Sequence, residues 1–183
     1  MKTLSPIATL LLVVTMLLLV CPPAWGQEDE YPRTEVFGGA SYLNADAKIL
    51  REDFYGWQAS VSRNVHRNVG FTADFGGQYK SFDLGPFGNI DFQTYEILFG
   101  PRFTARNDTA TTFVHTLFGV VHERVGGVSG TSFAMGFGMG VDVNVSSWAA
   151  VRIFQIDYIP NVHDGVWFHE GRFAAGVVFK WGQ

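Results

Sequence analysis

The segment FAMGFGMGVDVNV, residues 133–145, alternates strictly between two kinds of side chain. Every odd-numbered position carries a large apolar residue, and every even-numbered position carries a small or polar one. A period of two residues predicts a β-strand whose two faces meet different surroundings. The bulky face is therefore expected to lie against an apolar environment, and the small face against a crowded or polar one.

Seven other segments show the composition and length of β-strands, and none has the periodicity of an amphipathic helix. The predicted strands are mostly longer than the usual 5 to 6 residues. A tilted strand needs about 9–11 residues to cross a bilayer. We therefore expect an all-β fold, an eight-stranded antiparallel up-and-down transmembrane β-barrel. Besides 132–145, its predicted strands are 35–43, 55–64, 69–79, 92–103, 111–122, 148–159 and 171–181.

The predicted connections alternate in length along the chain. Short connections at one end of the strands and long loops at the other are typical of transmembrane barrels. The short connections are expected at 65–68, 104–110 and 146–147, and the long loops at 44–54, 80–91, 123–131 and 160–170.

Five of the predicted strands have phases clear enough to assign their faces. Over 57–61, 71–79, 95–103, 133–145 and 173–181, the odd positions are mostly bulky and apolar and carry no charge. A charge that faces lipid at mid-bilayer costs roughly 2–4 kcal/mol, so lipid would enforce such sorting. We expect the bulky phase to face lipid and the charged residues to form a network in the lumen. These charges are Asp74, Glu96, Arg102, Asp142, Arg172 and Lys180.

A soluble lipocalin-like barrel, the less favoured architecture, would place its apolar phase inside. An eight-stranded interior has room only for a filled core or one small ligand. The seven large residues of 133–145 alone are too bulky for that space. The inner charges are expected to pair with one another as a structural network, because buried charges must be paired. A pore or a ligand site is the alternative role for these charges.

Three predicted strands cannot be oriented from the sequence. In 35–43 both phases are small and mildly apolar, and in 111–122 His115 and His122 lie on opposite phases. In 148–159, Arg152 and Asp157 also lie on opposite phases, so both can point inward only if the strand contains a β-bulge.

Aromatic residues gather near both predicted ends of the strands. Such belts are favoured at the two membrane–water interfaces. We expect a girdle formed near the long loops by Tyr42, Trp57, Tyr79, Tyr95 and Tyr158, and near the short connections by Phe71, Phe103, Trp148 and Trp181.

Residues 1–26 read as a secretory signal peptide, with an apolar run at 7–20 and a small residue, Gly26, before the expected cleavage point. An N-terminal anchor and a lipoprotein at Cys21 are the alternatives, although Val20 is bulky for a lipoprotein site. Residues 27–34 would then be a lead-in and 35–183 the barrel. The formal net charge of −4 argues against nucleic acid as a partner.

With these features, the chain resembles the small OmpA/OmpX-like outer-membrane barrels of Gram-negative bacteria. The last strand, GRFAAGVVFKWG, resembles their C-terminal insertion signal, although Gly182 and Gln183 follow the final aromatic residue. The resemblance implies location in the outer membrane, contact with its lipid and insertion by the barrel-insertion machinery. It also implies a monomer, with an extracellular ligand of unknown identity at the long loops.

Some barrels of this kind are enzymes that act on lipid A, and the deacylase type places a Ser two residues after a His on one strand face. None of the five histidines here has a Ser at that spacing. His122 and Glu123 are the residues to test for the alternative function, a lipid-modifying enzyme, while a metal site at His163 and His169 lacks a third ligand. We expect no enzyme activity, no cofactor and no metal, and a structural or surface-interaction role carried by the long loops.

Overall fold

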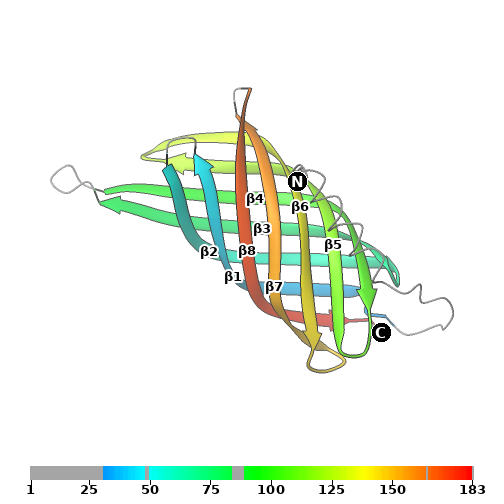
Figure 1. Cartoon of the computed structure of the whole chain (residues 1–183). Helices are drawn as coiled ribbons and strands as arrows, with labels where there is room; N and C mark the ends of the chain where they lie inside the picture. The colour runs from blue at the N-terminus through cyan, green and yellow to red at the C-terminus, as the bar shows by residue number, and fades with distance from the viewer. Residues whose placement is uncertain (1–30, 48–49, 84–88, 164, 183) are drawn as a thin grey trace, which may run out of the picture. The chain divides into compact units, whose positions relative to one another are not determined.

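The computed structural model describes residues 31–47, 50–83, 89–163 and 165–182. The predicted signal peptide, 1–26, and the first residues of the lead-in lie outside this range. Eight antiparallel strands follow one another around a closed barrel, in chain order, and β8 pairs with β1 (Figure 1). The strands are β1 (Thr34–Ala47), β2 (Leu50–His66), β3 (Val69–Asp83), β4 (Asn89–Arg106), β5 (Ala110–Val125), β6 (Val128–Asn144), β7 (Ala149–His163) and β8 (Val166–Trp181).

The predicted fold class and strand order are confirmed. Pairing of β1 with β8 runs from Thr34↔Trp181 to Asp46↔His169, so the backbone ladder closes around the barrel. Closure removes the exposed edges that an open sheet would present. The described residues include no helix with the length and hydrophobicity needed to cross a bilayer.

The prediction of four long loops is wrong for most of their residues. The strands continue into 44–54, 80–91, 123–131 and 160–170, and adjacent strands stay paired there. Charged and polar residues suggested loops, but a hairpin whose backbone groups bond to each other can carry such side chains. The hairpins β1–β2, β3–β4, β5–β6 and β7–β8 lie at one end of the barrel, and the C-terminus lies at the other (Figure 1). Residues 48–49, 84–88 and 164 lie outside the described residues.

The turn between β5 and β6 shows how short these connections are. Val125 pairs with Val128, which leaves only Gly126 and Gly127 between the strands. Both glycines have positive φ angles, 54° and 92°. Two-residue hairpin turns of this kind need positive φ at both central residues, which glycine adopts without steric cost.

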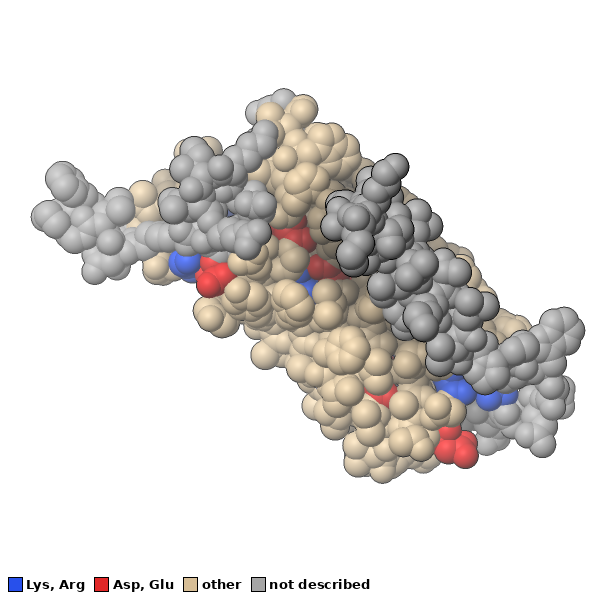
Figure 2. All heavy atoms as spheres, in the orientation of Figure 1, with Lys and Arg blue, Asp and Glu red and all other residues tan. Residues whose placement is uncertain are grey.

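The exposures of the side chains follow the two predicted phases. Outward residues such as Ile97, Phe99 and Phe118 are exposed, while alternate residues such as Leu98 are buried. Figure 2 shows one face on which charged atoms are few and uncharged residues cover most of the described surface. Arg63 is an exception, because it lies in the predicted strand 55–64 and points outward, where it donates a hydrogen bond to Thr34.

The structure also orients the three strands that the sequence left open. Glu35 and Phe37 of β1 are buried inside, and His115 points inward while His122 lies on the opposite phase of β5. The pairing of β7 with β8 shifts between Arg152 and Gln155, as expected of a β-bulge. Ile153 and Phe154 are both exposed at this shift, so Arg152 and Asp157 both reach the interior.

The glycines of β6 make room for large inward side chains on the neighbouring strands. A Cβ atom on Gly138 would overlap the carboxylate of Asp157 and the ring of His115, and one on Gly140 would meet the ring of Phe113. The small residues of the segment at 133–145 therefore point into the lumen, where the side chains of neighbouring strands leave no room for larger ones.

Candidate functional site: the ion-pair network inside the barrel

Arg172 of β8 is fully buried. It lies at the centre of the half of the lumen nearer the β1–β2, β3–β4, β5–β6 and β7–β8 hairpins. Its Nη2 donates to Asp74 Oδ1 of β3 at 2.7 Å, and its Nε donates to Asp157 Oδ2 of β7 at 3.0 Å. Its Nη1 donates to Glu96 of β4. One guanidinium therefore bonds to three carboxylates from three strands, and it ties together strands that are not neighbours. We call this group the Arg172 cluster.

His115 of β5 joins the same cluster. Its Nε2 lies 2.9 Å from Asp157 Oδ1. Gln58 donates to Asp74 Oδ2 at 2.6 Å, so Asp74 also has a partner for its second oxygen. Hydrogen bonds to charged groups are stronger than those between neutral groups, so these contacts offset much of the cost of burying the charges. The network is not fully satisfied, because Glu96 Oε1 and Gln58 Oε1 are buried and have no hydrogen-bond partner among the described residues.

The half of the lumen nearer the short turns holds more cations. Glu35 Oε2 accepts from Arg102 Nη1 at 2.7 Å, and its Oε1 accepts from Arg106 Nη2 at 2.6 Å and from Asn64 Nδ2 at 3.0 Å. Asp142 Oδ1 accepts from Arg152 Nε at 2.7 Å. We call this group, together with Lys180, the turn-side cluster.

Aromatic rings separate the arginines of the turn-side cluster. The guanidinium of Arg102 lies 4.2 Å from the centroid of the Phe113 ring, and that of Arg152 lies 4.4 Å from the same centroid. Arg152 also lies 4.2 Å from the Phe37 ring centroid. Cation–π contacts of desolvated arginines are favourable, so Phe113 stabilises two like charges that would otherwise repel each other.

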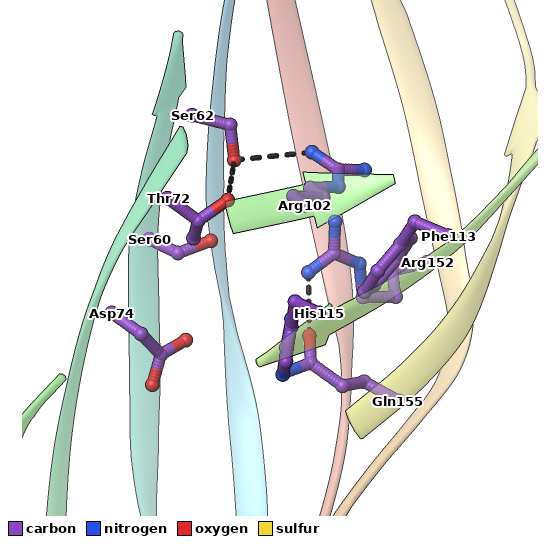
Figure 3. Close-up of a pocket in the computed structure, with 9 residues that line it drawn as sticks. All are labelled: Ser60, Ser62, Thr72, Asp74, Arg102, Phe113, His115, Arg152 and Gln155. Carbon is purple, nitrogen blue, oxygen red and sulfur yellow. Dashed lines mark hydrogen bonds between the residues drawn. The ribbon is translucent and has the colours of Figure 1, made fainter. Parts of the chain in front are cut away.

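Gln155 connects the two clusters. Its Oε1 accepts from Arg152 Nη1 at 2.6 Å, and its Nε2 donates to Asp157 Oδ2 at 2.8 Å. Figure 3 shows the side chains around the small space at this level, which is too small to hold a water molecule. This space is lined by Ser60, Ser62, Thr72, Asp74, Arg102, Phe113, His115, Arg152 and Gln155.

The structure places all six predicted network residues inside the barrel, and it divides them between the two clusters. Asp74, Glu96 and Arg172 form one, while Arg102, Asp142 and Lys180 belong to the other. Lys180 bonds through Nζ to Asn144 Oδ1 at 2.6 Å. Sequence reasoning missed Glu35 because β1 has no clear phase, Arg106 because it follows the predicted strand, and Asp157 because the bulge changes the phase of β7.

The aromatic residues of the predicted girdle all lie on the outward phase. Eight of the nine are exposed, and Tyr42, which also points outward, is partly buried. Several contact one another: Trp57 Nε1 donates to Tyr79 Oη at 3.3 Å, and the rings of Tyr79 and Tyr95 have centroids 6.0 Å apart. The predicted set is Tyr42, Trp57, Phe71, Tyr79, Tyr95, Phe103, Trp148, Tyr158 and Trp181.

The histidines considered for chemistry are spread over the barrel. His122 Nδ1 bonds to Thr131 Oγ1 at 2.8 Å, and Glu123 lies on the opposite phase of β5. His169 stacks on Tyr158 and bonds to its hydroxyl at 2.6 Å, while the side chain of His163 lies outside the described residues. Within the described part of the chain, no three His, Cys, Asp or Glu side chains are arranged to hold a metal ion.

No known family model matches this sequence, and no curated protein matches it. Solved structures do match. The attachment invasion locus protein Ail of Yersinia pestis, in complex with the heparin analogue sucrose octasulfate, matches with a TM-score of 0.64 and 15% identity, over 83% of this chain and 100% of that one. Neisserial surface protein A matches with a TM-score of 0.64 and 15% identity, over 84% of this chain and 100% of that one.

The outer membrane protein OprG of Pseudomonas aeruginosa matches with a TM-score of 0.53 and 8% identity, over 84% of this chain and 98% of that one. At these identities the likeness concerns the fold, which all three structures share with this chain. The closed eight-stranded barrel, together with its apolar outer band, is that of the small bacterial outer-membrane β-barrels.

Proposed function

We propose that this chain is a non-enzymatic integral outer-membrane protein with a structural or surface-interaction role. The observation that carries the proposal is the sorting of the side chains. The outward face is apolar around the barrel, and the inward face holds the ion pairs. Water would favour the opposite arrangement, whereas lipid favours this one.

The position of the chain in the membrane follows from the aromatic girdle. We take the membrane-spanning segments to be the parts of the strands between its two belts. In β8 this segment is Gly171–Trp181, because Gly171 pairs with the belt residue Tyr158 and Trp181 belongs to the other belt. The barrel-insertion machinery would insert the chain by its last strand, and outer-membrane lipid would surround it as a monomer.

The paired hairpins that extend beyond the belt at Tyr42 and Tyr158 are the part that would meet an extracellular partner. In the described part of the β1–β2 hairpin, side-chain hydrogen bonds add to those of the backbone. Asp53 accepts from the Tyr42 hydroxyl at 2.6 Å and from Asn44 Nδ2 at 3.0 Å. These hydrogen bonds, with that of Tyr42 the larger, keep the pKa of Asp53 below its usual range. A carboxylate held by two such hydrogen bonds gives an extracellular ligand a defined point of contact.

The first test uses the resistance of closed barrels to SDS. The chain is folded in detergent and run on gels with and without boiling, and a folded barrel should migrate differently in the two lanes. A single unshifted band, from a protein that dissolves without detergent, would contradict the proposal. In planar bilayers we expect no steady conductance, because side chains fill the lumen between the two clusters.

The second test places a charge on the outward face. Phe99 lies on β4 and is 56% exposed. Phe99→Lys should lower the free energy of unfolding in lipid vesicles by roughly 2–4 kcal/mol if this side chain faces the bilayer. Phe99→Leu is the control and should change it by much less. Equal folding of the Lys and Leu variants would mean that Phe99 faces water.

A further inference from the structure

Among the described residues, one buried carboxyl group has no cationic partner in hydrogen-bond contact. Glu170 of β8 is 5% exposed, and its Oε1 accepts a hydrogen bond from Asn161 Nδ2 of β7 at 3.0 Å. Its Oε2 is buried and has no hydrogen-bond partner within the described part of the chain. Ala45 of β1 and Ile159 of β7, its partners across the two ladders, are apolar residues. Neither of these two paired residues carries a group that could neutralise a negative charge on Glu170.

The charged groups that act on Glu170 are mostly of its own sign. Glu96 of β4 and Glu123 of β5 repel a negative charge there, and Arg172 of β8 attracts it. The donors of Arg172, however, are directed to Asp74, Glu96 and Asp157. Asp157 is also bonded to His115. The Arg172 cluster thus has three carboxylates for one guanidinium before Glu170 is counted.

Glu35 provides the contrast within the same lumen. Both glutamates are buried to a similar extent, but Glu35 is bonded to two arginines and to Asn64. A buried carboxylate with such partners stays ionised, whereas a buried carboxyl group without a counter-ion takes up a proton instead.

We propose that Glu170 is a proton-binding site at the hairpin end of the lumen, neutral at neutral pH, and that release of its proton loosens this end of the barrel. The group lies just beyond Gly171–Trp181, the segment of β8 that we take to span the membrane. Burial, then the charges of Glu96 and Glu123, raise the pKa of Glu170 to about 8. A negative charge released there would lie beside the Arg172 cluster without a partner.

The direction of the pH dependence follows from this shift. In the unfolded chain the carboxyl group titrates near the ordinary value for Glu, about 4.3. The folded barrel holds the proton more tightly, so the stability that Glu170 contributes is fully present below that value. This contribution decreases as the pH rises and is lost once the pH passes through about 8.

The test compares the wild-type chain, Glu170→Gln and the matched control Glu35→Gln, each folded in detergent micelles. Infrared spectroscopy should detect the C=O stretch of a protonated carboxylic acid in the wild type at pH 7. Glu170→Gln should lose intensity in that band, and Glu35→Gln should keep it. An unchanged band in Glu170→Gln would show that Glu170 is ionised and would overturn the proposal.

A second readout measures the coupling to stability. The urea concentration at the unfolding midpoint of the wild type should decrease as the pH is raised from 6 to 9. In Glu170→Gln this decrease should be no more than half as large. Glu35→Gln should retain the wild-type pH dependence. An equal fall in the wild type and Glu170→Gln would overturn the coupling. If Glu170→Gln does not fold, titration of the infrared band of the wild type decides: loss of the band near pH 8 supports the proposal, and its absence at pH 7 refutes it.

Discussion

The two clusters of the lumen use opposite arrangements of charge. In the Arg172 cluster one guanidinium bonds to Asp74, Glu96 and Asp157. In the turn-side cluster, Glu35 and Asp142 are shared among Arg102, Arg106 and Arg152. The first arrangement depends on a single side chain, and the second distributes its pairs over several. The barrel should therefore respond very differently to the loss of one arginine from each cluster.

The largest expected effect is that of Arg172→Met. Removing this guanidinium leaves three buried carboxylates without their common cation, and loss of one partner from a buried ion pair costs about 3–5 kcal/mol. Urea unfolding in lipid vesicles, followed by tryptophan fluorescence, measures the free energy of unfolding. The control is Arg106→Met, which should cost about 1 kcal/mol because Glu35 keeps Arg102. Equal losses of unfolding free energy in Arg172→Met and Arg106→Met would show that the Arg172 cluster does not depend on its single arginine more than the turn-side cluster depends on one of its own.

The second prediction concerns the space beside the Arg172 cluster. Gly138→Ala places a methyl group against Asp157 and His115, which are held by their own bonds. Overpacking of this kind costs about 1–3 kcal/mol. Gly136→Ala is the control, because its methyl group would meet Leu98 Cδ1, the end of a flexible side chain, at 3.1 Å. The same urea titration measures the free energy of unfolding of both variants. A greater loss of stability in Gly136→Ala than in Gly138→Ala would contradict the prediction that the space beside Asp157 and His115 is the tighter one.

The smallest effect is expected for the turn-side cluster. Phe113→Leu removes the ring between Arg102 and Arg152 while leaving their ion pairs in place. The cation–π contribution lost should be about 1 kcal/mol. Phe118→Leu, the same change on the outward phase of β5, controls for the change in side-chain size. If Phe118→Leu costs as much as Phe113→Leu, the ring between the arginines contributes nothing specific.

Much of the fold could be read from the order of the residues. The segment at 133–145 predicted two unlike faces, and the charges of five strands predicted which face is inside. These inferences were accurate because the strand period is two and lipid excludes charge from one face. The prediction of four long loops was wrong for most of their residues, because polar composition does not distinguish a loop from a paired strand in water.

The site was less accessible to sequence reasoning. Glu35 lies on a strand whose phases look alike, and the phase of Asp157 is reset by the bulge after Arg152. The partners of Arg172 come from β3, β4 and β7, and their pairing depends on how far each strand is shifted along its neighbour.

The sequence by itself determined that this chain forms strands and which side chains most of them turn inward, because alternation is a local property of a strand. Only the tertiary structure decided which charges meet, because closure of the barrel sets the register between strands. That register brings Arg172 to three carboxylates and Glu35 to two arginines, and among the described residues it leaves Glu170 without a cation in hydrogen-bond contact.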